Sequence, residues 1–135
     1  MALIWVGNIE DLTEDNETFR TVLWTGAHSE LTIMSIAPGD EIGLEVHPNN
    51  DQFLRIEEGQ GQVKVGPAEE NLTETYEVEG DWAFIIPAGT WHNVINTGDG
   101  PLKLYTVYSP PNHPDGTVHK TKAEADAAEA AEHHS

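Results

Sequence analysis

Short apolar segments recur along most of the chain, and turns rich in glycine, proline or asparagine separate them. Segments rich in Val, Ile, Leu, Thr and Trp are typical of β-strands. This pattern predicts strands at residues 3–6, 19–25, 29–37, 42–46, 52–57, 62–65, 75–78, 82–86, 92–96 and 102–108. Many short strands at a spacing of about eight to twelve residues indicate an all-β sandwich or barrel. Gly59-Gln60-Gly61 is expected to close a hairpin, and residues 9–12 to form one helical turn.

The last part of the chain has a different pattern. A proline-rich arm follows the final strand at residues 109–116. Thr121-Lys122-Ala123-Glu124 is a capping-box sequence that starts a helix, and the Ala- and Glu-rich residues after it favour helix. We therefore expect one β-barrel over residues 1–120, including the N-terminal strands and the arm, followed by a short C-terminal helical tail over residues 121–135.

Two stretches place potential metal ligands on or beside predicted strands. Glu45 and His47 are two residues apart, so on a strand both side chains lie on the same face. Alternation with the apolar residues of the next strand puts Gln52 on its apolar face. His92 follows a Pro-Ala-Gly turn at the start of another strand. Two imidazoles, one carboxylate and one amide oxygen suit one divalent metal ion such as Zn, Fe, Mn or Ni.

Each of these residues also has an ordinary structural interpretation. Glu45 and His47 are consistent with the solvent-exposed face of a strand whose other face is apolar, and His92 with a half-buried histidine after a turn. Gln52 is a weak, neutral ligand, so it either binds the metal or hydrogen-bonds a water molecule on it. The occurrence of both spacings in one chain favours the metal site over four separate structural residues.

The same two stretches resemble the two sequence motifs of the cupin superfamily. The first motif is a Gly, five residues, His-x-His, three or four residues, Glu, six residues and a Gly. The chain keeps that spacing at Gly39, Glu45, His47, Gln52 and Gly59. A Glu therefore replaces the first His, and a Gln replaces the Glu. The second motif, Gly-x5-Pro-x-Gly-x-x-His-x3-Asn, is matched at Gly80, Pro87, Gly89, His92 and Asn96. One extra residue after the Gly of the second motif can be absorbed by a β-bulge.

The resemblance extends from about residue 8 to residue 125. The chain is similar to the small single-domain cupins often labelled mannose-6-phosphate-isomerase-like, and residues 109–119 are typical of that group. The resemblance implies a double-stranded β-helix, the jelly-roll barrel of cupins. It also implies a homodimer, because cupin barrels commonly pair through their outer strands. The strand at residues 3–6 and the apolar face formed by Ile42, Leu44 and Val46 are the surfaces expected to need covering.

The cupin resemblance implies a metal-dependent enzyme, an isomerase or an oxygenase, that acts on a small polar molecule. The alternative is a non-catalytic small-molecule or metal-binding module, because this fold hosts many functions. The chain has no nucleotide-binding glycine loop, nucleophile elbow or cysteine, and no catalytic residue is assigned. A sugar phosphate would need a cation in the pocket, and strand parity points Arg55 away from Gln52. His113 and His119 are interpreted as surface or packing histidines.

The charge balance argues against several kinds of partner. The chain has 24 Asp and Glu against 6 Lys and Arg, a formal net charge of −18. Nucleic acid and anionic membranes need basic surface, so neither is expected as a partner. The acidic surface fits a halophilic protein from a high-salt cytoplasm or an ordinary acidic protein.

With no apolar run of membrane-spanning length and no signal-peptide pattern, we expect a cytoplasmic protein. His133 and His134 are given no catalytic role.

Overall fold

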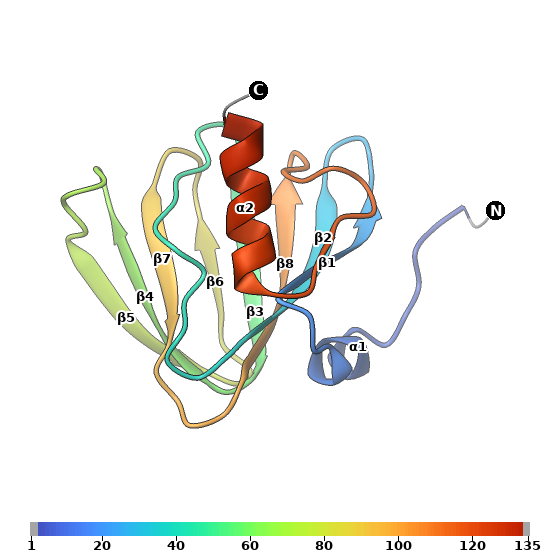
Figure 1. Cartoon of the computed structure of the whole chain (residues 1–135), viewed down its shortest axis with the longest axis horizontal. Coiled ribbons are helices and arrows are strands. Elements are labelled where there is room, and N and C mark those ends of the chain that lie inside the picture. The colour runs from blue at the N-terminus through green and yellow to red at the C-terminus, as the bar shows by residue number, and fades with distance from the viewer. Residues whose placement is uncertain (1–2, 134–135) are drawn as a thin grey trace.

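Two antiparallel β-sheets face each other across one apolar core in the computed structural model, which describes residues 3–133 (Figure 1). The larger sheet contains β1 (Arg20–Thr25), β2 (Glu30–Ile36), β3 (Asp51–Glu58), β6 (Ala83–Ile86), β8 (Leu102–Ser109) and β9 (Val118–His119). The smaller sheet contains β4 (Gln60–Gly66), β5 (Glu74–Glu79) and β7 (Trp91–Asn96). Their orders are β6-β3-β8-β2-β1-β9 and β5-β4-β7, so the chain passes repeatedly between the sheets. This arrangement confirms the predicted double-stranded β-helix.

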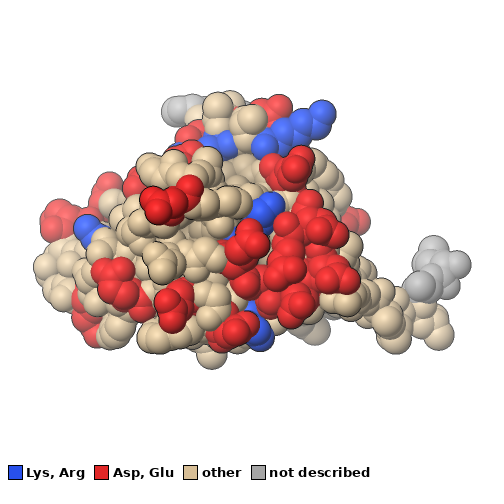
Figure 2. All heavy atoms as spheres, turned by 90° about the horizontal axis from the view of Figure 1, so that it is seen from below, with Lys and Arg blue, Asp and Glu red and all other residues tan. Residues whose placement is uncertain are grey.

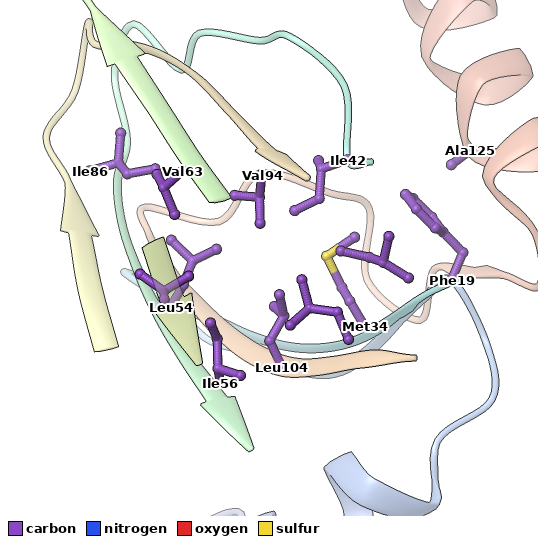
Figure 3. Close-up of a cluster of buried hydrophobic side chains, with 13 residues drawn as sticks. Phe19, Met34, Ile42, Leu54, Ile56, Val63, Ile86, Val94, Leu104 and Ala125 are labelled. Atoms are coloured by element: carbon purple, nitrogen blue, oxygen red, sulfur yellow. The ribbon is translucent and has the colours of Figure 1, made fainter. Parts of the chain in front are cut away.

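Alternating residues of the strands build the core between the sheets. On β3, Gln52, Leu54 and Ile56 are 1%, 0% and 0% exposed, which confirms the predicted parity of this strand. Met34 of β2 and Leu104 of β8 lie on the same side of the core (Figure 3). Burying one such aliphatic side chain contributes about 1.5–3 kcal/mol, so this layer supplies much of the stability of the barrel.

The turn after β3 is a corner between the sheets and not a hairpin. The hairpin predicted at Gly59-Gln60-Gly61 is wrong, because β3 and β4 belong to different sheets. Gly59 has a φ of +101°, and a Cβ at this position would lie 2.6 Å from the carbonyl oxygen of Pro101. Glycine is therefore required here by the close approach of a second chain segment.

The segment before the first ligands is irregular. The strand predicted at residues 42–46 is wrong, because the segment pairs with β7 through isolated bridges at Glu41 and Glu45 only. Gly43 has a φ of +113°, which interrupts the alternation of side chains. Ile42 consequently lies in the core at 8% exposed, whereas Leu44 is 41% exposed. The expected shared apolar face of Ile42, Leu44 and Val46 therefore does not form.

The N-terminal residues lie outside the sheets. The strand predicted at residues 3–6 is absent, and Leu3, Ile4 and Val6 are exposed on a segment that leads away from the barrel (Figure 1). The helical turn predicted at residues 9–12 is a longer helix, α1 (Ile9–Asp15). Asn8 caps α1, because its side-chain oxygen accepts a hydrogen bond from the backbone N–H of Asp11.

A second helix, α2 (Lys122–His133), crosses the barrel in front of the sheets (Figure 1). The predicted cap at Thr121 is confirmed, because Thr121 Oγ1 accepts from the N–H of Glu124 at 3.1 Å. The return bond of a capping box is displaced by one residue: Glu124 Oε2 accepts from the N–H of Lys120 at 2.6 Å and not from that of Thr121. Ala125 is 4% exposed and joins the core. Neither helix within residues 3–133 has the length and apolar character needed to cross a membrane. His134 lies outside the described residues.

Candidate metal centre and its cavity

Three of the four predicted ligands converge inside the barrel. The ligand atoms of Glu45, His47 and His92 all lie within 4.8 Å of one another. Glu45 Oε1 is 3.2 Å from His47 Nε2 and 3.4 Å from His92 Nε2. The backbone fixes this arrangement, because Glu45 and His92 exchange two N–H···O bonds of 2.9 Å and His47 accepts a third from Gly89. The two cupin-like stretches are thus joined directly at the ligands.

His92 presents an unsatisfied acceptor to this group. Its Nδ1 lies 2.9 Å from the carbonyl oxygen of Thr90, which can only accept, so Nδ1 carries the proton. In the neutral ring Nε2 then has a lone pair, and this buried atom has no hydrogen-bond partner among the described residues. A backbone carbonyl that fixes the tautomer of an imidazole is the usual support of a metal-binding histidine.

Gln52 presents a second unsatisfied acceptor to the interior. The side chain is 1% exposed, and its Nε2 donates to Thr106 Oγ1 at 3.1 Å. Its Oε1 is buried and has no partner within the described part of the chain. Buried polar atoms are normally paired. The orphaned atoms of Gln52 and His92 are therefore what a cation inside the barrel would satisfy, and the N/O donor set fits a divalent ion.

The carboxylate of Glu45 is held in its charged form. Burial opposes its ionisation, but the neighbouring ring of His47, whose Nε2 contacts Glu45 Oε1, favours the charged form and holds the pKa of Glu45 below its usual range. Glu45 is therefore ready to bind a cation at neutral pH, since a metal binds the deprotonated carboxylate.

A cavity of about 230 Å³ opens beside these ligands. Glu45 and His47 line one side of it, and Ala125 and Ala128 of α2 line another. The small side chains on this face of α2 leave space where larger ones would fill the cavity. The Ala-rich composition of α2 thus shapes the cavity as well as favouring helix.

The proline-rich arm closes the cavity through a buried carboxylate. Glu30 is fully buried and accepts backbone N–H bonds from Asn112 at 2.9 Å and His113 at 2.7 Å. Its Oε2 accepts from Thr32 Oγ1 at 2.5 Å and from His113 Nδ1 at 2.9 Å. Burial opposes ionisation of Glu30, but these hydrogen bonds prevail and lower its pKa to about 2. His113 packs as expected, and it also lines the cavity.

Three residues around the site, Glu30, Tyr108 and Arg20, were not predicted from the sequence. Tyr108 is 1% exposed, and its ring contacts His47 and His113 edge-on at centroid distances of 5.5 and 5.2 Å. Strand alternation could have identified Glu30 and Tyr108 as inward-pointing residues. Glu30 alternates with buried residues of β2, and Tyr108 with buried residues of β8. Arg20 likewise alternates with buried Val22 on β1.

A second group of acidic residues has a different character. Glu10, Asp11 and Glu14 of α1 lie close enough together to hold an ion, but all three are exposed. No histidine or buried acceptor accompanies them in that group, so it has the character of a solvated acidic surface.

Comparison with known proteins agrees with this geometry. YrkC of Bacillus subtilis, described as uncharacterized, is 60% identical over 125 residues, which are 93% of this chain and 67% of that protein. The crystal structure of BH2720 from Bacillus halodurans has 59% identity and a TM-score of 0.90, covering 91% of this chain and 93% of that chain. The Lactobacillus farciminis oxalate decarboxylase–formate complex has 26% identity and a TM-score of 0.57, covering 64% of this chain and 25% of that chain.

The family assignment rests on more than half of the chain. The model of the family described as "Cupin domain" matches residues 32–108, which include all four predicted ligands. The fold, the motif spacing and this match agree, and the chain belongs to the cupin family.

Proposed function

We propose that this protein is a metal-dependent enzyme that transfers a proton on a small polar molecule. The observation that carries the proposal is the convergence of Glu45, His47 and His92 beside the cavity. These residues would hold one divalent ion, with Gln52 as a fourth ligand or as a hydrogen-bonding group next to it. Such an ion polarises a carbonyl or hydroxyl oxygen of a substrate.

His113 is the proton acceptor in this proposal. Its Nδ1–H donates to Glu30 Oε2, which leaves the lone pair on Nε2 of the neutral ring. The ionised Glu30 stabilises the ring once Nε2 has taken a proton. Because His113 lines the cavity that Glu45 and His47 also line, one small molecule can reach all three. A positioned base of this kind contributes about 10²–10⁴-fold to a rate.

Proton transfer of this kind is the chemistry of an isomerase. The resemblance of the chain to the mannose-6-phosphate-isomerase-like cupins points the same way. One of the similar structures, the oxalate decarboxylase, is an enzyme. A chain with this fold and 26% identity can therefore be catalytic, which supports the proposal. A non-catalytic binding module is the second candidate. It is favoured by the two departures from the cupin motif, Glu45 and Gln52, which change the charge and strength of the ligand set.

Elemental analysis tests the metal site. Protein purified without chelators or nickel resin should contain about one divalent ion per chain, and His47→Ala and His92→Ala should each abolish it. Gln52→Glu should tighten binding, because a carboxylate is a better ligand for a hard cation. His28→Ala, a change at an exposed loop histidine, is the matched control. Unchanged metal content in both the His47 and His92 variants would refute the site.

Solvent exchange tests the reaction. Metal-loaded protein in D₂O should exchange carbon-bound protons next to the oxygen of small hydroxyketones and keto acids, as followed by NMR. His113→Gln should lower that rate by roughly 10²-fold or more and leave the metal content unchanged. Absence of exchange across the panel, with metal bound, would favour the non-catalytic module. Consumption of dioxygen with these substrates would instead indicate an oxygenase.

A further inference from the structure

Arg20 is a buried cation without an anionic partner among the described residues. It is 7% exposed, and no carboxylate among the described side chains, which end at residue 130, forms an ion pair with it. One guanidinium nitrogen, Nη1, lies 3.3 Å from His119 Nδ1, and the group lies 5.3 Å from the ring centre of Phe19. Its Nε is buried and has no hydrogen-bond partner in that part of the chain. A buried charge is costly unless it is paired, so this site calls for an anion.

The guanidinium faces the same cavity as the proposed metal ligands. Arg20, Glu45 and His47 all line this space of about 230 Å³. Pairing of β1 with β9 sets Arg20 opposite His119, which fixes the cation at the wall of the cavity. Glu129 of α2 also lines the cavity and is exposed. Arg20 and His119 both lie outside residues 32–108, so the family match does not account for them.

We propose that the cavity binds a small carboxylate, with its anionic group on Arg20 and its other oxygen toward Glu45 and His47. A guanidinium is a permanently charged donor, and its N–H groups form strong charge-assisted hydrogen bonds with a carboxylate. On Arg20, Nη1 lies against His119 and Nε is sealed from solvent, so Nη2 is the nitrogen that is free to donate to a ligand in the cavity. The contact of the ligand's other oxygen near Glu45 and His47 rests on the proposed function. The contact of its carboxylate with Arg20 does not need the metal ion.

The charge and size of the cavity favour a carboxylate over a phosphate. Arg20 is the only Lys or Arg among the residues that line the cavity within the described chain. Arg20 supplies one positive charge, and Glu45 and Glu129 in the same lining oppose any further negative charge on a ligand. A singly charged carboxylate therefore fits better than a phosphate monoester, which carries about −1.5 to −2 near pH 7. The volume lies below the roughly 300–1,000 Å³ typical of sites for drug-sized ligands, so a short hydroxy or keto acid fits better than a sugar.

Calorimetric titration with lactate, its neutral isostere lactamide and inorganic phosphate tests the assignment. Each probe is added to metal-free and to zinc-loaded full-length protein. In both forms, lactate should bind roughly tenfold or more tightly than lactamide, because charged hydrogen bonds are stronger than neutral ones. Arg20→Gln should remove that difference and leave the zinc content unchanged. Arg55→Gln is the matched control, since Arg55 pairs with Glu57 and Asp81 outside the cavity.

The outcomes separate this proposal from the proposed function. Lactate binding that depends on Arg20, in a protein that neither retains metal on purification nor takes up added zinc, would support the carboxylate site and refute the metal-dependent enzyme. Normal metal content with unchanged lactate affinity in Arg20→Gln would overturn the carboxylate site alone. Tighter binding of phosphate than of lactate by the native protein would also overturn it.

A measurement on folded protein guards against loss of structure in the Arg20 variant. The chain has arginine only at positions 20 and 55, so Arg55→Gln retains a single arginine Nε–H signal. That NMR signal should shift on addition of lactate and stay in place on addition of lactamide. An Nε–H signal unmoved by saturating lactate would count against the proposal even if Arg20→Gln does not fold. Arg20→Lys should restore part of the affinity that Arg20→Gln loses, since it keeps the positive charge without the planar guanidinium.

Discussion

At the scale of single residues, Glu30 has the clearest consequence for stability. Its carboxylate is fully buried and accepts four hydrogen bonds, three of them from the arm at Asn112 and His113. Asn112 is 82 positions away along the chain. Because these bonds favour the ionised form, protonation of Glu30 weakens the link between the arm and β2. The position of His113 in the cavity therefore depends on Glu30.

The pKa of Glu30 predicts a specific acid sensitivity. Its pKa falls from 4.5 to about 2 on folding, so the folded state binds this proton less readily than the unfolded state. The resulting stabilisation of about 3 kcal/mol is present above pH 4.5 and is lost as the pH falls through 2. In Glu30→Gln, the free energy of unfolding in urea should be lower at pH 7 and should decline less between pH 4.5 and 2.

Glu69→Gln, a change at an exposed glutamate, is the control for this experiment. Its stability should stay within about 0.5 kcal/mol of the native protein at neutral pH. If Glu30→Gln and the native protein show the same pH dependence, the arm is not held by this carboxylate.

At the scale of elements, the irregular segment before β3 decides where the ligands point. Gly43 adopts a φ of +113°, and its N–H donates to Asn93 Oδ1 at 3.0 Å on β7. This turn lets Ile42 enter the core and still brings Glu45 into a bridge with His92. A regular strand would keep strict alternation and could not leave Leu44 more exposed than Ile42.

Gly43→Ala should therefore damage both stability and the ligand geometry. No backbone atom lies within 4 Å of the added Cβ, so the effect comes from the conformation and not from a clash. Strain of this kind costs about 1–3 kcal/mol, measurable by denaturant unfolding, and metal affinity should fall at the same time. Gly100→Ala is the matched control, because Gly100 has open space around it and no positive φ. Equal metal affinity in both variants would show that the turn does not position Glu45.

At the scale of the whole molecule, apolar surface is left uncovered on the single chain. Leu3, Ile4 and Val6 are 101%, 69% and 79% exposed. A second apolar area is a groove lined in part by Tyr76, Ile85 and Pro87. Contiguous apolar surface of this kind is usually a site of interaction. The homodimer stays a prediction, and the N-terminal segment is the surface we expect a second copy to cover.

Light scattering over a range of concentrations should give the mass of two chains. The double variant Ile4→Asp and Val6→Asp should give one chain, because two charges at the interface oppose burial. Its metal content should stay unchanged, since neither residue lies at the ligands. A monomer mass for the native protein at every concentration would refute the dimer.

Carboxylates gather on one face of the molecule around α1 (Figure 2). Loss of hydration and the neighbouring charges of Glu10, Glu58 and Glu57 raise the pKa of Glu14. A raised carboxylate pKa means that the ionised group destabilises the fold, so this repulsion is absent at low pH and present at neutral pH. Only 6 Lys and Arg oppose the 24 acidic residues over the whole chain. Repulsion in this patch should therefore depend on salt.

The melting temperature should rise steeply between low and molar potassium chloride at pH 7. The screening length falls from about 30 Å at 0.01 M to about 3 Å at 1 M, which removes most repulsion between exposed carboxylates. Sodium chloride should act similarly, whereas sulfate also strengthens apolar burial and is unsuitable. A melting temperature that stays flat over the chloride range would show that the acidic surface is merely solvated, as in an ordinary acidic protein.

The sequence by itself determined the features that depend on near neighbours. Strand alternation is set by successive residues, so it predicted the inward position of Gln52 correctly. The helix cap at Thr121 depends on residues within one turn, and it too was predictable. Glu45, His47 and His92 were recognisable as candidate ligands for a similar reason, because the spacing within each cupin-like stretch is a local property of the chain.

Only the tertiary structure decided which distant residues meet. The corner at Gly59 looks locally like a hairpin, but its strands find partners in different sheets because pairing depends on the packing of the whole barrel. Arg20 and His119 face each other through the pairing of β1 with β9. No local pattern encodes such contacts, because their energy comes from burying surfaces contributed by both ends of the chain. The wall of the cavity opposite the ligands was therefore determined by the fold.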